Sequence, residues 1–151
     1  MLYYNQGYFS EALAEIQKCN ELQENHPWLP VREFQIYWQI GEEEKAHESL
    51  WAILERDSIY NLEIAKDIYE DSGLQSLIQW KLKIDEAHDE NSPYAIASTY
   101  GMIGEDEKAL YWLEKAYTAH QTGEIYFNIH FRDLHNNPRY IEILKNMGLE
   151  E

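Results

Sequence analysis

The stretch that decides the fold is Pro93–Gln121, PYAIASTYGMIGEDEKALYWLEKAYTAHQ. Gly104 divides it into two segments, and Tyr100 lies four residues before this glycine. Small or apolar residues follow the glycine at offsets of five, nine and twelve: Ala109, Leu113 and Ala116. Steps of four and three residues place these three side chains on one face of a helix. Because glycine readily adopts the left-handed conformation that ends many helices, the stretch predicts two helices joined near Gly104.

The same frame occurs three more times along the chain, at spacings of 34, 32 and 31 residues. Its glycines are Gly7, Gly41, Gly73 and Gly104, preceded by Tyr3, Tyr37, Tyr69 and Tyr100. The offset of five carries Ala12, Ala46, Ile78 or Ala109, and the offset of twelve carries Cys19, Ile53, Asp85 or Ala116. The unit around Gly73 deviates most, and the first unit is incomplete because only residues 1–6 precede its glycine.

This pattern resembles the tetratricopeptide repeat, a pair of antiparallel helices, over about residues 1–127. The resemblance implies an all-α fold, a right-handed solenoid of antiparallel helix pairs with about 3.5 repeats. It implies two regions, the repeat array over residues 1–127 and a C-terminal cap over residues 128–151.

The last residues predict a capping helix of their own. Asn137 suits the cap, Pro138 the first helical position and Gly148 the end. The apolar face of this helix is expected to hold Tyr140, Ile141, Leu144 and Met147. The segment resembles the end of many bacterial tetratricopeptide regulators, in which the array follows a DNA-binding or cyclase domain. We therefore expect the chain to be the C-terminal interaction module of a larger bacterial regulator.

Composition restricts the class of partner. Twelve basic residues against 28 acidic ones give a formal net charge of −16. Such a charge disfavours direct nucleic-acid binding and anionic membranes, and it favours proteins or peptides with basic residues. A single cysteine, Cys19, and the lack of a signal peptide or a long apolar run indicate a cytoplasmic protein.

The sequence favours a binding protein rather than an enzyme, with no cofactor and no metal. It contains no phosphate-binding glycine loop and no metalloprotease or serine-hydrolase motif. Cys19 occupies a core offset, so we expect a small buried residue rather than a nucleophile. Glu63 and Asp67 could share a proton as a catalytic pair, but we expect them to lie on a solvated acidic face. A metal or catalytic centre would have to use the histidine and acidic residues that lie closest together in the sequence, His130, Asp133 and His135.

The resemblance also implies a concave groove lined by the first helix of each repeat. Its lining positions lie three, six and ten residues before each glycine. They are Tyr4 in the first unit, Val31, Gln35 and Trp38 in the second, Glu63, Asp67 and Glu70 in the third, and Tyr94, Ser98 and Gly101 in the fourth. An acidic and aromatic groove would suit a basic peptide with an apolar anchor. Some members of the family bind a C-terminal carboxylate in this groove. The acidic residues of the third unit argue against such a carboxylate-binding site in this chain.

Two other interpretations remain open. The groove residues could be solvated side chains of a helical spacer. Alternatively, the chain could dimerise through the apolar end of its incomplete first repeat, around Leu2, Tyr3 and Phe9.

Overall fold

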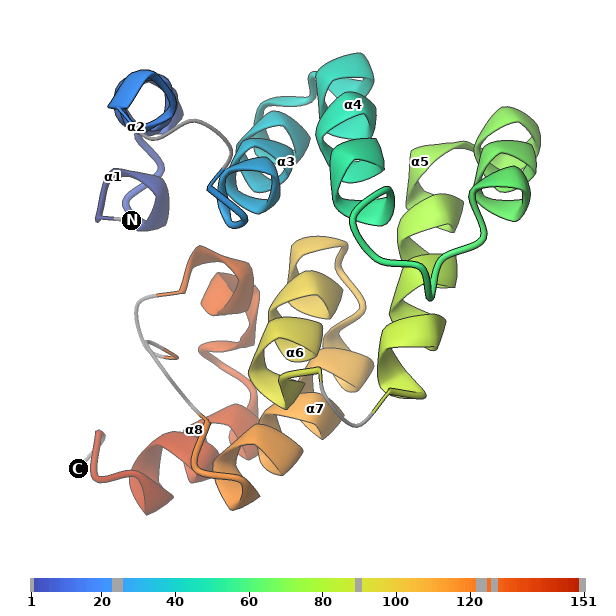
Figure 1. Cartoon of the computed structure of the whole chain (residues 1–151). Coiled ribbons are helices and arrows are strands. Elements are labelled where there is room, and N and C mark those ends of the chain that lie inside the picture. Colours follow the sequence, from blue (N-terminus) through green and yellow to red (C-terminus); the bar gives the residue numbers. More distant parts are fainter. Residues whose placement is uncertain (1, 23–25, 89–90, 122–124, 126–127, 150–151) are drawn as a thin grey trace. The chain divides into compact units, whose positions relative to one another are not determined.

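Every regular element in the described part of the chain is helical, which confirms the prediction of an all-α fold. The computed structural model describes residues 2–22, 26–88, 91–121, 125 and 128–149. Its elements, labelled in Figure 1, are α1 (Leu2–Asn5), α2 (Phe9–Leu22), α3 (Leu29–Ile40), α4 (Glu43–Leu54), α5 (Leu62–Glu86), α6 (Pro93–Met102), α7 (Asp106–Thr118), the 3-10 helix η1 (Ile129–Leu134) and α8 (Pro138–Asn146). No helix of the described residues is long and apolar enough to cross a membrane.

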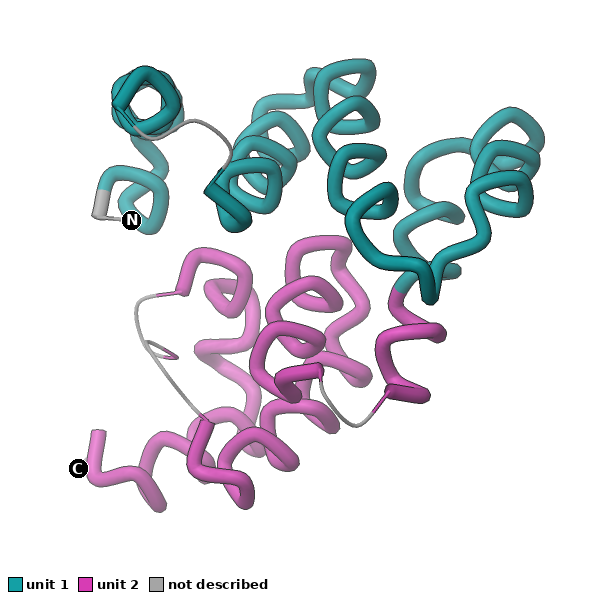
Figure 2. The backbone as a smooth tube through the Cα atoms, viewed as in Figure 1, with its two compact units in different colours: residues 1–81 teal, residues 82–151 magenta. Residues whose placement is uncertain are grey.

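The chain divides into two compact units, Met1–Lys81 and Leu82–Glu151 (Figure 2). Unit 1 holds α1 to α4 and most of α5, and unit 2 holds the end of α5 and the remaining helices. The division into an array over residues 1–127 and a cap over residues 128–151 stays a prediction.

The turn at Gly41 explains the spacing of the sequence frame. Gly41 ends α3 in the left-handed conformation with a φ of 79°, and the N–H of Glu42 donates to the carbonyl of Tyr37 at 2.9 Å. The carbonyl of Glu42 then accepts from the N–H of Ala46, also at 2.9 Å. One residue therefore ends the first helix and begins the second. The same two bonds recur around Gly7 (Tyr8 to Tyr3, Ala12 to Tyr8) and around Gly104 (Glu105 to Tyr100, Ala109 to Glu105).

The first two positions of the predicted apolar stripe, at the offsets of five and nine, are buried in each second helix. Exposed fractions are 6% or less at the first two offsets of all four units: Ala12, Ile16, Ala46, Leu50, Ile78, Leu82, Ala109 and Leu113. The absence of a long side chain at Ala46 and Ala109 lets α3 approach α4 and α6 approach α7 closely.

Gly73 interrupts α5 in a different way. A helix ends there as predicted, but the expected left-handed cap is wrong. Gly73 has a φ of 84° and a ψ of −175°, a nearly extended conformation with positive φ that only glycine adopts readily. Figure 1 shows the two parts of α5 as separate helical segments joined at this bend.

The predicted terminal helix is present as α8. The side chain of Asn137 accepts a hydrogen bond from the N–H of Arg139 at 3.0 Å, and Pro138 begins the helix. Tyr140 is fully buried and its hydroxyl donates to the carbonyl of Ile125 at 3.0 Å. Ile143, which the expected apolar face did not include, is 4% exposed. The buried face is therefore rotated slightly from the predicted one, because Ile141 and Met147 are only partly buried.

Arg139 attaches α8 to α7. Its Nε and Nη1 atoms donate to Glu114 and Glu107, each at 2.9 Å. The hydrogen bond with Glu114 is the main cause that raises the pKa of Arg139. The three groups are largely exposed, so this contact fixes orientation more than it adds stability.

Candidate functional site

The groove positions predicted in unit 1 lie on α3 and on the first part of α5. Val31, Gln35 and Trp38 are partly buried, and Gln35 accepts a hydrogen bond from Arg32 at 2.9 Å. The acidic positions on α5 are all exposed: Glu63, Asp67 and Glu70. Their spacing of four and three residues puts them on one helical face. The structure thus retains an acidic, solvent-facing row on α5.

Tyr4 was predicted to line the groove, but the structure buries it. Its side chain is 3% exposed, its ring packs against Phe9 with centroids 5.7 Å apart, and its hydroxyl donates to the carbonyl of Gln35 at 3.4 Å. Burial is the first cause that raises the pKa of Tyr4, which keeps the phenol neutral. Tyr4 joins the core of unit 1, where it also borders a cavity lined by residues of α2 and α3.

The groove positions predicted in unit 2 are occupied by the chain itself. Ser98 is 6% exposed, and its hydroxyl lies 2.7 Å from Nδ1 of His130. The side-chain amide of Asn128 donates to Ser98 at 3.1 Å and to the hydroxyl of Tyr94 at 2.9 Å. The ring of Phe131 packs edge-on against Tyr94. The segment with η1 thus folds back over this face of α6 and buries Ser98, whereas Tyr94 stays partly exposed.

Gly101 shows how closely η1 approaches α6. A Cβ atom built there would lie 2.5 Å from the backbone oxygen of His130, closer than real atoms come. Glycine at this position of α6 is thus required by the covering segment, which leaves Ser98 buried and Tyr94 partly exposed.

A cavity of about 450 Å³ lies between α4 and the first part of α5. We call it the α4–α5 pocket, and its lining residues are His47, Glu48, Trp51, Lys66, Tyr69 and Glu70. The rings of His47 and Tyr69 are stacked, with centroids 3.7 Å and planes 11° apart. Trp51 lies 5.8 Å from the imidazole of His47, so that three rings form one aromatic wall.

The carboxylates of the α4–α5 pocket come from both helices. Glu70 pairs with Lys66 at 3.8 Å, but both side chains are more than 60% exposed, so the pair contributes little. Glu48 forms no salt bridge with any residue that the structure describes. Two carboxylates against one ammonium leave the pocket with a negative balance.

The aromatic wall itself carries no charge near neutral pH. Burial lowers the pKa of His47, although the charges of Glu48 and Glu43 act in the opposite direction. Burial, followed by the charges of Glu43 and Glu44, raises the pKa of Tyr69. His47 and Tyr69 are therefore neutral, and Nε2 of His47 is buried without a hydrogen-bond partner among the described residues.

Sequence reasoning missed this pocket, although it included Glu70 in the groove. Neither His47 nor Trp51 was among the candidate site residues. Their spacing of four residues was a usable signal, since it places both rings on one face of α4. The contact with Tyr69 could not be found, because it depends on how α4 and α5 pack.

A second cavity, of about 390 Å³, brings Trp38 close to the bend at Gly73. Its walls come from the end of α3, the start of α4 and residues 72–75 of α5. Trp38, a predicted groove residue of α3, thus lines a cavity.

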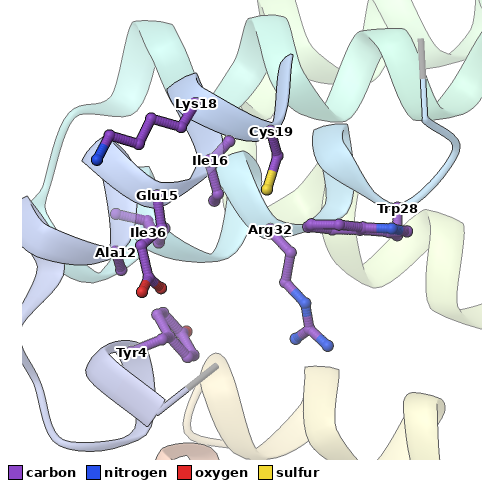
Figure 3. A pocket seen from close by; sticks show the side chains of 9 residues that line it. All are labelled: Tyr4, Ala12, Glu15, Ile16, Lys18, Cys19, Trp28, Arg32 and Ile36. Carbon is purple, nitrogen blue, oxygen red and sulfur yellow. The ribbon is translucent and has the colours of Figure 1, made fainter. Parts of the chain in front are cut away.

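Cys19 was expected to be a buried core residue, and that prediction is wrong because its side chain is exposed. It borders another cavity of about 390 Å³ together with Trp28 and Arg32. In Figure 3 its sulfur points toward the side where Arg32 and Trp28 lie, and Lys18 extends away from them. Helix α1 has four residues and spans only about 6 Å, so it cannot cover the third turn of α2.

The polar group His130, Asp133 and His135 is not gathered into one centre. His130 is buried against Ser98, Asp133 is exposed, and His135 stacks on Tyr140 with centroids 5.3 Å apart. Among the residues with described positions, no three histidine, cysteine or acidic side chains are placed to hold a metal ion.

Comparisons with known proteins do not extend these observations. No family model matches the chain, and neither a curated protein nor a solved structure matches it significantly.

Proposed function

We propose that this chain is a protein-binding helical-repeat module of the tetratricopeptide type, whose partner carries basic residues. The observation that carries the proposal is the row of exposed carboxylates on α5, formed by Glu63, Asp67 and Glu70. With a net charge of −16, this row favours association with a positively charged surface.

The repeated helix turn supports the tetratricopeptide part of the proposal. Three turns, at Gly7, Gly41 and Gly104, share the same pair of hydrogen bonds, in which the residue after the glycine donates to the tyrosine carbonyl and accepts from the alanine N–H. Repetition of one hydrogen-bonded unit is how solenoid proteins build extended binding surfaces. The proposal includes a solenoid arrangement, a capping function for α8, and a non-enzymatic function in the cytoplasm within a larger bacterial regulator.

A capture experiment tests this function. The double variant Trp38→Ala/Asp67→Ala removes one aromatic and one acidic group from the proposed surface. We expect it to retain fewer basic proteins from a bacterial lysate than the wild type, with the captured proteins identified by mass spectrometry.

The matched control is Trp28→Ala/Glu21→Ala, which likewise removes one tryptophan and one acidic residue, at positions outside the proposed surface. It should capture the same basic proteins as the wild type. Identical capture by the test variant and the wild type would refute the surface assignment.

Self-association is the second candidate, and one surface feature favours it. Tyr3 and Tyr8 are 40% and 54% exposed, and their rings meet edge-on with centroids 6.5 Å apart. Phe9 is partly buried, and the exposure of Leu2 lies outside the described residues. An exposed aromatic pair of this kind can form an interface between copies. Light scattering at micromolar concentration tests it: a dimer that Tyr3→Ser/Tyr8→Ser converts to a monomer is expected, and a strictly monomeric wild type excludes it.

A further inference from the structure

We propose that the α4–α5 pocket is a docking site for an arginine side chain of the partner protein. The proposal rests on the protein-binding function and names the chemical group that one site would recognise. The site differs from the predicted groove, because its aromatic wall is formed mainly by the second helix of one repeat, α4.

The aromatic wall suits a planar cation. Trp51, His47 and Tyr69 provide three ring faces or edges around one cavity of about 450 Å³. Guanidinium groups stack on aromatic rings and are weakly hydrated, so they enter such a cavity more readily than an ammonium group. The indole of Trp51 provides the strongest cation–π contact of the three.

The two carboxylates supply the complementary charge. Glu48 on α4 and Glu70 on α5 line the same cavity from opposite helices. A guanidinium has five N–H donors in a fixed fork, so that it can donate to carboxylates on two sides while its face contacts a ring. Lys66 already pairs with Glu70, but the pair is exposed and weak, and an incoming arginine can displace it.

The protonation state of the wall is compatible with a cationic ligand. Burial lowers the pKa of His47, so its imidazole does not repel a guanidinium at neutral pH. The charged groups that face His47 are Glu43 and Glu48 from α4 and Lys66 and Glu70 from α5. Only one of these four groups is positive.

The other cavities of unit 1 fit a cation less well. The cavity beside Cys19 already contains Lys18 and Arg32 against a single acid, Glu15. The cavity beside Trp38 has one carboxylate, Glu43, and lies at the bend of α5. The α4–α5 pocket combines three rings with carboxylates from two helices and holds a single lysine. A cavity of unit 2 also joins rings with carboxylates from two helices, but it already holds two lysines, Lys83 and Lys108.

Titration with a blocked amino acid tests the proposal directly. The probe is N-acetyl-arginine methylamide, added to the full chain with 15N label and followed by the indole N–H resonance of Trp51. We expect a saturable shift of this resonance and of the amides of Tyr69 and Glu70. Blocked citrulline has the same shape without the charge, and it should bind at least about tenfold more weakly. Equal binding of citrulline would overturn the proposal.

A pair of charge variants supplies the second measurement. Glu48→Gln/Glu70→Gln removes both carboxylates without changing the aromatic wall, and it should weaken arginine binding by about tenfold or more. Glu21→Gln/Glu55→Gln removes the same net charge from exposed positions outside the pocket and should leave binding unchanged. If both variants weaken binding equally, only the overall charge of the chain attracts arginine. Preferential binding of blocked lysine would contradict the choice of guanidinium.

The protein-binding function and the arginine site can be refuted separately. If a captured partner binds wild type and Glu48→Gln/Glu70→Gln equally, the arginine site is wrong and the scaffold function stands. If blocked arginine saturates the Trp51 resonance but no protein partner is captured, the site is correct and the scaffold function is wrong.

Discussion

His120 ends α7 in the left-handed conformation, with a φ of 56°. Its N–H donates to Tyr117 at 3.0 Å, and the next N–H, of Gln121, donates to Ala116 at 2.8 Å. These are the bonds that glycines make at the other helix ends, but a residue with a Cβ atom is strained there. We expect His120→Gly to raise the free energy of unfolding by up to about 1 kcal/mol, measured by urea denaturation. Gly104→Ala, the reciprocal change at a φ of 81°, should lower the free energy of unfolding. A lower free energy of unfolding in both variants would contradict the argument.

His47 should make stability depend on pH. Its pKa is lowered in the folded chain by burial, whereas in the unfolded chain it is about 6.5. As pH falls below about 6.5, the unfolded state therefore binds more protons, and stability decreases until the pH passes the folded pKa. Above this window His47 contributes no pH dependence. We expect the wild type to lose more stability between pH 7 and pH 5 than His47→Gln, and parallel curves for the two proteins would refute the burial argument.

The candidate site was only partly predictable from single residues. Glu63 and Asp67 were expected on a solvated face and are exposed, as is Glu70, because helical spacing alone decides which side chains lie together. Tyr4 and Ser98 occupied equivalent positions by spacing, yet both are buried. Their burial depends on contacts across about 30 residues of sequence, with Gln35 and His130, and no local periodicity encodes such contacts.

At the scale of elements, η1 is held against α6 by the small size of Gly101. Replacing a helical glycine by alanine normally stabilises a helix by about 1 kcal/mol. At Gly101 the added Cβ would lie 2.5 Å from a backbone oxygen of His130, and backbone cannot yield as a flexible side chain does. We therefore expect Gly101→Ala to destabilise the protein by about 1–3 kcal/mol, measured by chemical denaturation, with the largest amide shifts at residues 128–134. A stabilised variant would show that η1 does not pack on α6.

The elements were more predictable than their packing. The hairpins at Gly41 and Gly104 follow from local hydrogen bonds between residues at most five positions apart, so the frame of tyrosine, glycine and alanine predicted them. The bend at Gly73 was predicted in place but not in geometry, because Ile78 and the residues around it depart from the frame. The path of η1 over α6 was not predictable, since nothing in the periodicity of residues 128–134 indicates which helix they cover.

At the scale of the whole molecule, the excess of negative charge affects both the stability of the fold and the binding of a partner. With 28 acidic and 12 basic residues, most carboxylates cannot pair with a cation of the chain. Like charges on a folded chain repel one another and lower its stability. The same excess attracts a basic partner from solution, so that one property opposes folding and favours binding.

These two effects predict that added salt raises the stability of the fold and lowers the affinity for a cationic ligand. Raising NaCl from about 0.02 M to about 0.3 M shortens the screening length from roughly 20 Å to about 6 Å, which weakens both the repulsion within the chain and the attraction to a cation. We expect the melting temperature, followed by circular dichroism, to rise, while the affinity for blocked arginine, followed at Trp51, falls. Glu48→Gln/Glu70→Gln should retain the stabilising effect of salt and lose most of the salt dependence of binding. A melting temperature that falls with salt would mean that attractive pairs such as Arg139 with Glu107 and Glu114 outweigh the net repulsion, and the balance of charges inferred for the fold would be wrong.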